Sequence, residues 1–207
     1  MKSIIIVGVG RNGKTTLARK INEELNYFVI NLDKLMTVFE RAYPQLDVRI
    51  AWDYYEATEN VTPFLGHFFG IISSNEGFAG YLNLRRHAAP GSRFVLEGGH
   101  FSFDKIAEIF ETYGNGGLKD NYTLVGLVQM NKTEEDFFRD LRKYDTEDDW
   151  THGLDDEELL GLCGHLVKDN QFMYDKFIEH GFNIYDTGVE RERVFEKIIY
   201  DIKSGAI

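Results

Sequence analysis

The chain has 207 residues, enough for one α/β domain, and 43% of them are hydrophobic, which is ordinary for a globular protein. A net charge of −11 argues against a nucleic-acid partner, which needs a cationic surface, and no apolar run approaches the roughly 18 residues of a membrane span. The single cysteine, Cys163, and the lack of a signal-peptide pattern after Met1 favour a cytoplasmic protein without a membrane partner.

Strand and helix patterns alternate along the chain. Short bounded runs of β-branched and aromatic residues predict strands, and apolar residues at helical spacing predict helices. In chain order we expect a strand at 4–9, a helix at 14–25, a strand at 27–31, helices and loops over 34–90, a strand at 93–97, a helix at 103–113, a strand at 122–130, helices at 133–144 and 155–180, a strand at 183–186 and a last helix capped by Thr187. This alternation predicts one α/β domain over 1–207, with a parallel sheet covered by helices on both faces.

The segment from Gly8 to Thr16, GVGRNGKTT, follows the first predicted strand and fits two glycine-rich patterns. As G-x-G-x-x-G it is the dinucleotide turn of a Rossmann unit, with Asp33 at the distance of a ribose-binding acid. As G-x-x-x-x-G-K-[ST] it is the phosphate-binding loop of an NTPase. The glycines alone do not separate the two interpretations.

Lys14 decides between them. A cation in the first turn of a helix is unfavourable beside the positive end of the helix dipole, unless an anion lies in front of it. A phosphate held by the backbone N–H groups and by Lys14 removes the conflict, and Thr15 can then offer its hydroxyl to magnesium. The first 20 residues carry several cations and no acid, whereas 133–158 are strongly acidic, so a small polyanionic ligand is favoured. We therefore predict that ATP and Mg²⁺ are bound by the loop residues Gly8, Val9, Gly10, Arg11, Asn12, Gly13, Lys14, Thr15 and Thr16.

A second pattern points to GTP and is rejected. Asn131 to Glu134 reads Asn-Lys-Thr-Glu, close to the guanine-reading Asn-Lys-x-Asp of GTPases, but the last residue is Glu. Thr133 and Asp136 fit a helix-capping box better, and no Asp-x-x-Gly follows the third strand.

The stretch from Ile4 to Asp33, IIIVGVGRNGKTTLARKINEELNYFVINLD, resembles the opening of small P-loop kinases of the shikimate, gluconate and nucleoside monophosphate kinase group. The resemblance implies a three-layer α/β/α fold with a five-stranded parallel sheet in the order 2-3-1-4-5, an acceptor-binding insertion at 34–90 and a lid at 139–154. It also implies that Asp33 contacts the acceptor substrate or its hydroxyl. The same residue could instead cap a helix that starts at Lys34, and the two roles are compatible.

Further residues acquire roles from this resemblance. Glu97 ends the third strand and resembles the Walker B carboxylate, which implies a magnesium role with Thr15. Gly98 and Gly99 would let the substrate approach the backbone, and His100 is a candidate substrate contact. Arg139 and Arg142 lie on one helical face and resemble lid arginines that steady the transferred phosphoryl group. The Arg-Pro pair of shikimate kinase lids is absent, because Lys143 follows Arg142.

The function expected from these residues is ATP-dependent phosphorylation of a small-molecule, nucleoside or nucleotide acceptor. Catalysis would fall to Lys14, Asp33, Arg139 and Arg142. Two alternatives remain open: a nucleotide-dependent regulatory ATPase that binds a protein partner, and a toxin-type kinase acting on a nucleotide sugar. The sequence names neither the acceptor nor the oligomeric state.

Overall fold

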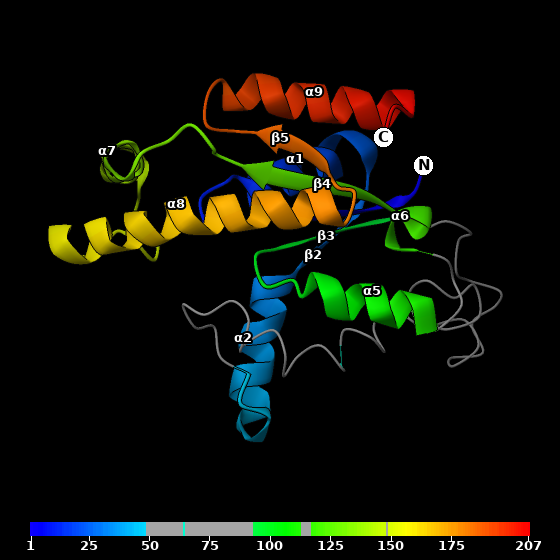
Figure 1. Ribbon diagram of the computed structural model, residues 1–207, viewed down its shortest axis with the longest axis horizontal. Helices are drawn as coiled ribbons and strands as arrows, with labels where there is room; N and C mark the ends of the chain where they lie inside the picture. The colour runs from blue at the N-terminus through cyan, green and yellow to red at the C-terminus, as the bar shows by residue number, and fades with distance from the viewer. Residues whose placement is uncertain (49–63, 65–92, 113–116, 148) are drawn as a thin grey trace.

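The computed structural model describes residues 1–48, 64, 93–112, 117–147 and 149–207 (Figure 1). Most of the predicted acceptor-binding insertion at 34–90 therefore lies outside the described residues, and only its first part, to residue 48, together with residue 64, can be compared. Within the described part of the chain, no helix combines the length and the apolar character needed to cross a membrane.

The described strands form one parallel sheet in the order β2-β3-β1-β4-β5, which confirms the predicted order. The strands are β1 (Ser3–Gly8), β2 (Phe28–Asn31), β3 (Phe94–Gly98), β4 (Tyr122–Val128) and β5 (Asn183–Asp186). In the register of the sheet, Ile6 on the central strand lies beside Glu97 on β3 and Val125 on β4. All five strands end at the same edge, so the loops that follow them gather there.

Helices connect the strands and cover the sheet. They are α1 (Lys14–Leu25), α2 (Leu32–Ala42), α5 (Phe103–Thr112), α6 (Leu118–Asn121), α7 (Glu134–Tyr144), α8 (Asp156–Glu179) and α9 (Arg191–Ser204), with a short 3₁₀ helix η1 (Pro44–Leu46). Thr133 and Asp136 form the predicted capping box at the start of α7, and Asp155 with Glu158 forms another before α8.

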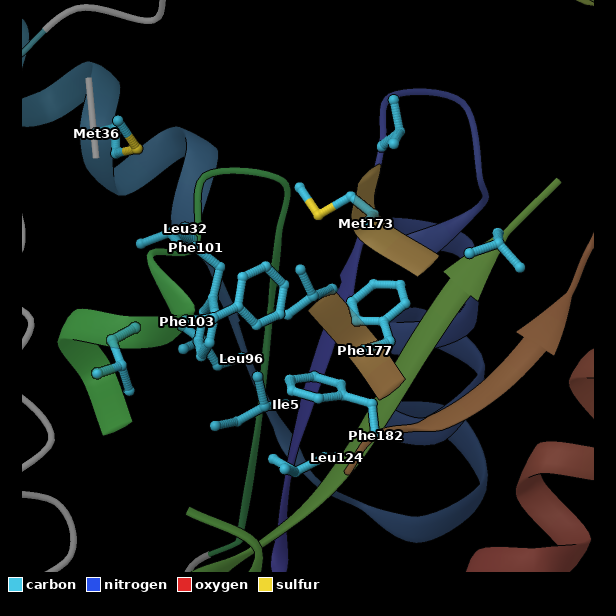
Figure 2. Close-up of a cluster of buried hydrophobic side chains, with 14 of the residues drawn as sticks. Ile5, Leu32, Met36, Leu96, Phe101, Phe103, Leu124, Met173, Phe177 and Phe182 are labelled. Atoms are coloured by element: carbon cyan, nitrogen blue, oxygen red, sulfur yellow. The ribbon is translucent and has the colours of Figure 1, made fainter. Parts of the chain in front are cut away.

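Two apolar clusters lie on opposite faces of the sheet because side chains alternate along each strand. Ile4 and Ile6 join α1 and α9 on one face, whereas Ile5 and Val7 join α2, α5, α7 and α8 on the other. Figure 2 shows the second cluster, in which Ile5 and Leu124 from the sheet face Phe177 of α8. The result is the predicted three-layer α/β/α arrangement (Figure 1).

Two predicted helix caps are wrong. The last helix begins at Arg191, and Thr187 caps nothing, since its hydroxyl lies 3.0 Å from the carbonyl of Asn12 and 3.3 Å from that of Val128. The cap of α2 is Asn31, whose Oδ1 accepts a bond of 2.6 Å from the N–H of Lys34. Asp33 therefore lies inside the first turn of α2, with its carboxylate directed to other partners.

Candidate active site

The loops at the carboxyl edge of the sheet enclose a cavity of about 720 Å³. Its lining includes the first turn of α1 and the loop before it, with Arg11, Gly13, Lys14, Thr15 and Thr16. It also includes Asp140 and Tyr144 of α7, Lys132 before that helix, Asp149 after it, and Arg191 of α9. In open parallel sheets, ligands bind outside the carboxyl ends of the strands, so this cavity is the candidate active site.

Gly13 sets the shape of the loop. Its φ of +88° is a conformation that side chains rarely adopt, and a Cβ there would lie 2.7 Å from the ring of Phe195 on α9. The glycine thus allows the loop to turn into α1 while it packs against the last helix. This turn leaves the first N–H groups of α1 at the cavity, an arrangement that suits an anion.

Asn12 supports the loop from behind. Its side chain is fully buried, and Nδ2 donates bonds of 2.7 Å to the carbonyl of Leu127 and 2.9 Å to Oδ1 of Asn170. Its Oδ1 accepts a bond of 3.1 Å from Nε2 of Gln129. The side chain of Asn12 therefore faces the protein interior, and Asn12 does not line the cavity.

Sequence reasoning missed the partners of Asn12. Asn170 is buried in the middle of α8 and also accepts a bond of 2.9 Å from the N–H of Gln129, so one amide ties α8, β4 and the phosphate loop together. The sequence contains a sign of this role, because the polar residue Asn170 interrupts the apolar stripe of α8 between Leu166 and Met173. Gln129 and Thr187, each just past a strand end, complete the same buried network.

Lys14 is buried, and its Nζ donates a bond of 2.9 Å to the carbonyl of Val9 in its own loop. Burial lowers the pKa of Lys14, while the charges of Asp33 and Glu97 act in the opposite direction. The charges of two carboxylates, one after β2 and one at the end of β3, therefore act on the buried ammonium.

Glu97 is almost fully buried at the end of β3. Its Oε1 accepts a bond of 3.1 Å from the hydroxyl of Thr15 and a short bond from Nδ2 of Asn31. Its Oε2 has no hydrogen-bond partner among the residues that the structure describes, and burial raises the pKa of Glu97 despite the charge of Lys14. A hydroxyl oxygen and a partly unsatisfied carboxylate this close together are oxygen ligands of the kind that Mg²⁺ prefers, so these residues fit the metal.

Asp33 lies in the first turn of α2, and its charge also acts on Glu97. Its Oδ1 accepts a bond of 3.2 Å from the N–H of Gly99 and is 3.1 Å from Nδ1 of His100. Burial acts to raise the pKa of Asp33, but the bond with His100, the charge of Lys14 and the Gly99 N–H outweigh it, so the pKa is lowered. The carboxylate is therefore ionised and held in place.

Gly98, the first of the two glycines after Glu97, allows α2 to pack closely against β3. A Cβ on Gly98 would lie 2.7 Å from Cβ of Leu32 and 3.1 Å from Oδ1 of Asp33. The glycine thus permits the first turn of α2 to lie directly on the end of β3. Its contact is with Asp33 rather than with open space, so Gly98 positions the predicted acceptor residue.

The predicted lid arginines do not line the cavity. Arg139 is exposed and pairs with Asp136 on its own helix, and Arg142 donates bonds of 3.0 and 2.6 Å to Asp156 at the start of α8. Besides Arg11 and Lys14 of the loop, Lys132 and Arg191 do line it. Lys132 pairs with Asp140 at 2.5 Å, and Arg191 donates a bond of 3.2 Å to the carbonyl of Arg11.

Solved structures resemble this chain, although no family model and no curated protein sequence matches it. A gluconokinase from Sinorhizobium meliloti 1021 is 12% identical, with a TM-score of 0.51 over 100% of this chain and 98% of that chain. A shikimate kinase from Bacteroides thetaiotaomicron is 18% identical, with a TM-score of 0.47, and the match covers 99% and 98% of the two chains. A deoxyadenosine kinase from M. mycoides, solved with bound dATP, is 13% identical, with a TM-score of 0.44 and coverage of 98% and 100%.

The sheet order and the match to the gluconokinase define the class of fold. The chain has the P-loop kinase-like fold, as the resemblance of the stretch from Ile4 to Asp33 predicted. No subfamily is assigned. At 12% identity the match shows the fold alone, and a fold does not define the chemistry of its site.

Proposed function

We propose that the protein is a kinase that transfers the γ-phosphate of ATP to a small-molecule, nucleoside or nucleotide acceptor. The observation that carries this proposal is the convergence of four side chains beside one phosphate-type loop. Thr15 is bonded to Glu97 at 3.1 Å, and Lys14 is close enough to Asp33 and Glu97 for both charges to act on its pKa. Phosphoryl transfer depends mainly on positioning and on charge stabilisation, and these residues supply both.

The loop would bind the nucleotide through its backbone. Within the predicted loop from Gly8 to Thr16, residues 13–16 line the cavity, and their N–H groups would form a cradle for the phosphates. The buried Asn12 network would keep that loop in shape. Lys14 would exchange its bond to the Val9 carbonyl for bonds to β- and γ-phosphate oxygens. Lys132 and Arg191, which line the same cavity, add positive charge near the phosphates.

Thr15 and Glu97 would hold Mg²⁺. When bound, the ion neutralises charge on the phosphate oxygens and fixes their geometry. The unpartnered Oε2 of Glu97 supports this role, because a buried carboxylate oxygen without a hydrogen bond is costly unless a ligand satisfies it.

Asp33 would act on the acceptor. The acceptor hydroxyl oxygen attacks the γ-phosphorus, the bond from that phosphorus to the bridging oxygen of ADP breaks, and the hydroxyl proton passes to Asp33. His100 and the N–H of Gly99 hold one carboxylate oxygen of Asp33, so its other oxygen can face the acceptor. Gly98, Gly99 and His100 would form the nearby acceptor wall.

Arg139 and Arg142 stay a prediction for the lid at 139–154. Both pair with carboxylates outside the cavity, so a contact with the transferred phosphoryl group would require the lid to move. Exposed ion pairs of this kind contribute little, about 0–1 kcal/mol, so their exchange for a phosphate contact is energetically accessible.

The test is incubation of the purified protein with Mg-ATP and a panel of sugars, polyols, nucleosides and nucleotides, with products read by mass spectrometry. We expect one class of acceptor to gain a phosphate in proportion to ADP formed. ATP consumption that depends on no acceptor would overturn the kinase proposal and favour a regulatory ATPase. Phosphate transfer to a nucleotide sugar alone would identify the toxin-type alternative.

A further inference from the structure

Arg11 occupies an unusual backbone position in the phosphate loop. Its φ of 69° lies in the left-handed region, which costs an ordinary residue about 1–2 kcal/mol and which glycine adopts freely. The loop therefore carries an arginine where its own backbone would favour glycine. We expect contacts of the Arg11 guanidinium to compensate for this strain.

The guanidinium of Arg11 contacts two carboxylates that follow α7. Its NH1 lies 2.5 Å from Oδ1 of Asp149, and its NH2 pairs with Oδ1 of Asp145. The Arg11 side chain is 21% exposed and that of Asp145 only 6%, so the group is partly withdrawn from water, where charge pairs interact more strongly than at an open surface. One side chain thus joins the phosphate loop to the predicted lid at 139–154.

Each carboxylate divides its two oxygens between Arg11 and its own turn. The second oxygen of Asp149 accepts bonds of 2.9 Å from the N–H and 3.0 Å from the hydroxyl of Thr146. The second oxygen of Asp145 accepts a short bond from the hydroxyl of the buried Thr151. The turn therefore presents two carboxylate oxygens to one guanidinium, as a phosphate group would present two of its oxygens.

Arg11 and Asp149 line the same cavity as Lys14 and Thr15. Phosphate oxygens in that cavity would attract Arg11, and they would be repelled by Asp145 and Asp149. Arg11 cannot satisfy two carboxylates and a polyphosphate fully at the same time. Binding of the nucleotide and the contact between Arg11 and the turn at 145–151 therefore oppose each other.

We propose that Arg11, Asp145 and Asp149 form an autoinhibitory latch that holds the 145–151 turn against the phosphate loop and that a nucleotide polyphosphate must release. The proposal rests on the proposed function, because it describes the regulation of the same nucleotide site. The latch lowers the affinity of the phosphate loop for the nucleotide. Its release frees the segment between α7 and α8 (Figure 1).

Two measurements test the latch. The first is the affinity of the protein for a non-hydrolysable ATP analogue in the presence of Mg²⁺, measured by calorimetry. D149N keeps the size of the side chain and an oxygen for Thr146 but removes the charge that faces Arg11, and we expect it to bind about 3–10-fold more tightly. The matched control is E147Q, which removes one exposed charge from the same turn and should stay within about twofold of the parent.

R11G separates the latch from a general charge effect, and glycine suits the backbone at this position. In the R11G background, D149N should raise the affinity by less than it does in the parent, because only the repulsion between Asp149 and the phosphates is then relieved. An equal gain with and without Arg11, or no gain from D149N in the parent, would overturn the latch.

The second measurement is hydrogen exchange of residues 145–154 without nucleotide, which does not depend on the proposed function. R11G should exchange faster there while the rest of the chain stays protected, and unchanged exchange would overturn the latch. If the parent binds no nucleotide and R11G still exchanges faster than the parent, the proposed kinase function is refuted. The contact between Arg11 and the turn at 145–151 then has a structural role only. That result would also overturn its regulatory role.

Discussion

The hydroxyl of Thr15 lies 3.1 Å from Oε1 of Glu97, and this bond joins the first turn of α1 to the end of β3. Residues 82 positions apart in the chain meet here because β1 and β3 are adjacent parallel strands that end at the same edge. The bond brings the predicted phosphate loop and the predicted Walker B carboxylate into one site. It also places an acid in a buried position that costs stability.

Replacement of Glu97 by Gln should stabilise the protein and abolish activity. Burial raises the pKa of Glu97, so the protonated form is favoured in the folded state, and stability is lost as the pH rises through the folded-state pKa. E97Q removes this loss, and Asp33 remains as an opposite charge for Lys14. We expect a Tm higher by a few degrees at pH 7, since about 1 kcal/mol corresponds to about 2–4 °C at this chain length.

The measurement is thermal unfolding of the parent and E97Q between pH 4 and pH 7, beside their turnover. The difference in Tm should shrink toward pH 4, where Glu97 becomes protonated in the parent. A lower Tm for E97Q at pH 7 would show that the ionised carboxylate stabilises the fold and would contradict the prediction.

Lys14→Ala should lower turnover by about 10²–10³, the scale for removal of one donor to the transition state. The ammonium is buried beside Asp33 and Glu97, so its loss removes the positive charge nearest the proposed phosphate position. Lys203→Ala is the control, since Lys203 is exposed and pairs with Glu24 at 2.6 Å on the surface. The measurement is the turnover of each variant in steady-state kinetics with the identified acceptor. Equal turnover for K14A and K203A would refute the role of Lys14.

Much of this arrangement could be predicted from the sequence because it depends on local pattern. The run from Ile4 to Val7 is apolar on both faces, as a central strand must be, and Lys14 at a helix start required an anion. The alternation of elements then fixed the layers, and the resemblance supplied the strand order. Glu97 was singled out by its place at a strand end, and the role of Asp33 was implied by the resemblance.

The partners of these residues could not be predicted because they depend on distant contacts. Thr187 has the spacing of a helix cap, yet its hydroxyl instead lies near the carbonyl of Asn12, 175 positions away. Arg142 has the spacing of a lid residue, yet it is bound to Asp156 at the start of α8. Helical spacing shows which residues share a face, and it does not show which neighbour that face will meet.

Asn170→Leu should destabilise the protein by about 1–3 kcal/mol and weaken nucleotide binding. The buried amide accepts bonds from Asn12 and from the N–H of Gln129, and leucine of similar size would leave the N–H unsatisfied. Gln171→Leu is the control on the same helix, because Gln171 is exposed and bonds only to Asp175 among the described residues. Urea unfolding and the KM for ATP give the two readouts. An N170L protein with unchanged KM would show that the amide serves stability alone.

Arg191→Ala should weaken nucleotide binding by about tenfold, whereas Arg193→Ala should leave it unchanged. Arg191 begins α9, lines the cavity beside Gly13 and forms no ion pair with any described residue. Burial lowers the pKa of Arg191, although the charge of Asp140 opposes this, so the guanidinium is held in a site that disfavours its charge. An anion in the cavity would compensate, because a buried cation is stabilised mainly by a close opposite charge.

Arg193 is the matched comparison for this test. It lies two residues further along the same helix, is 79% exposed and pairs with Glu190 at 3.2 Å. Titration of each variant with Mg²⁺ and the ATP analogue gives the affinity without any assumption about the acceptor. If R191A also loses stability, its Tm should recover as the analogue saturates the site, since ligand bound only to the folded state stabilises it. Equal affinities for R191A and R193A would place Arg191 outside the nucleotide site and would leave Lys14 and the loop N–H groups as the phosphate contacts.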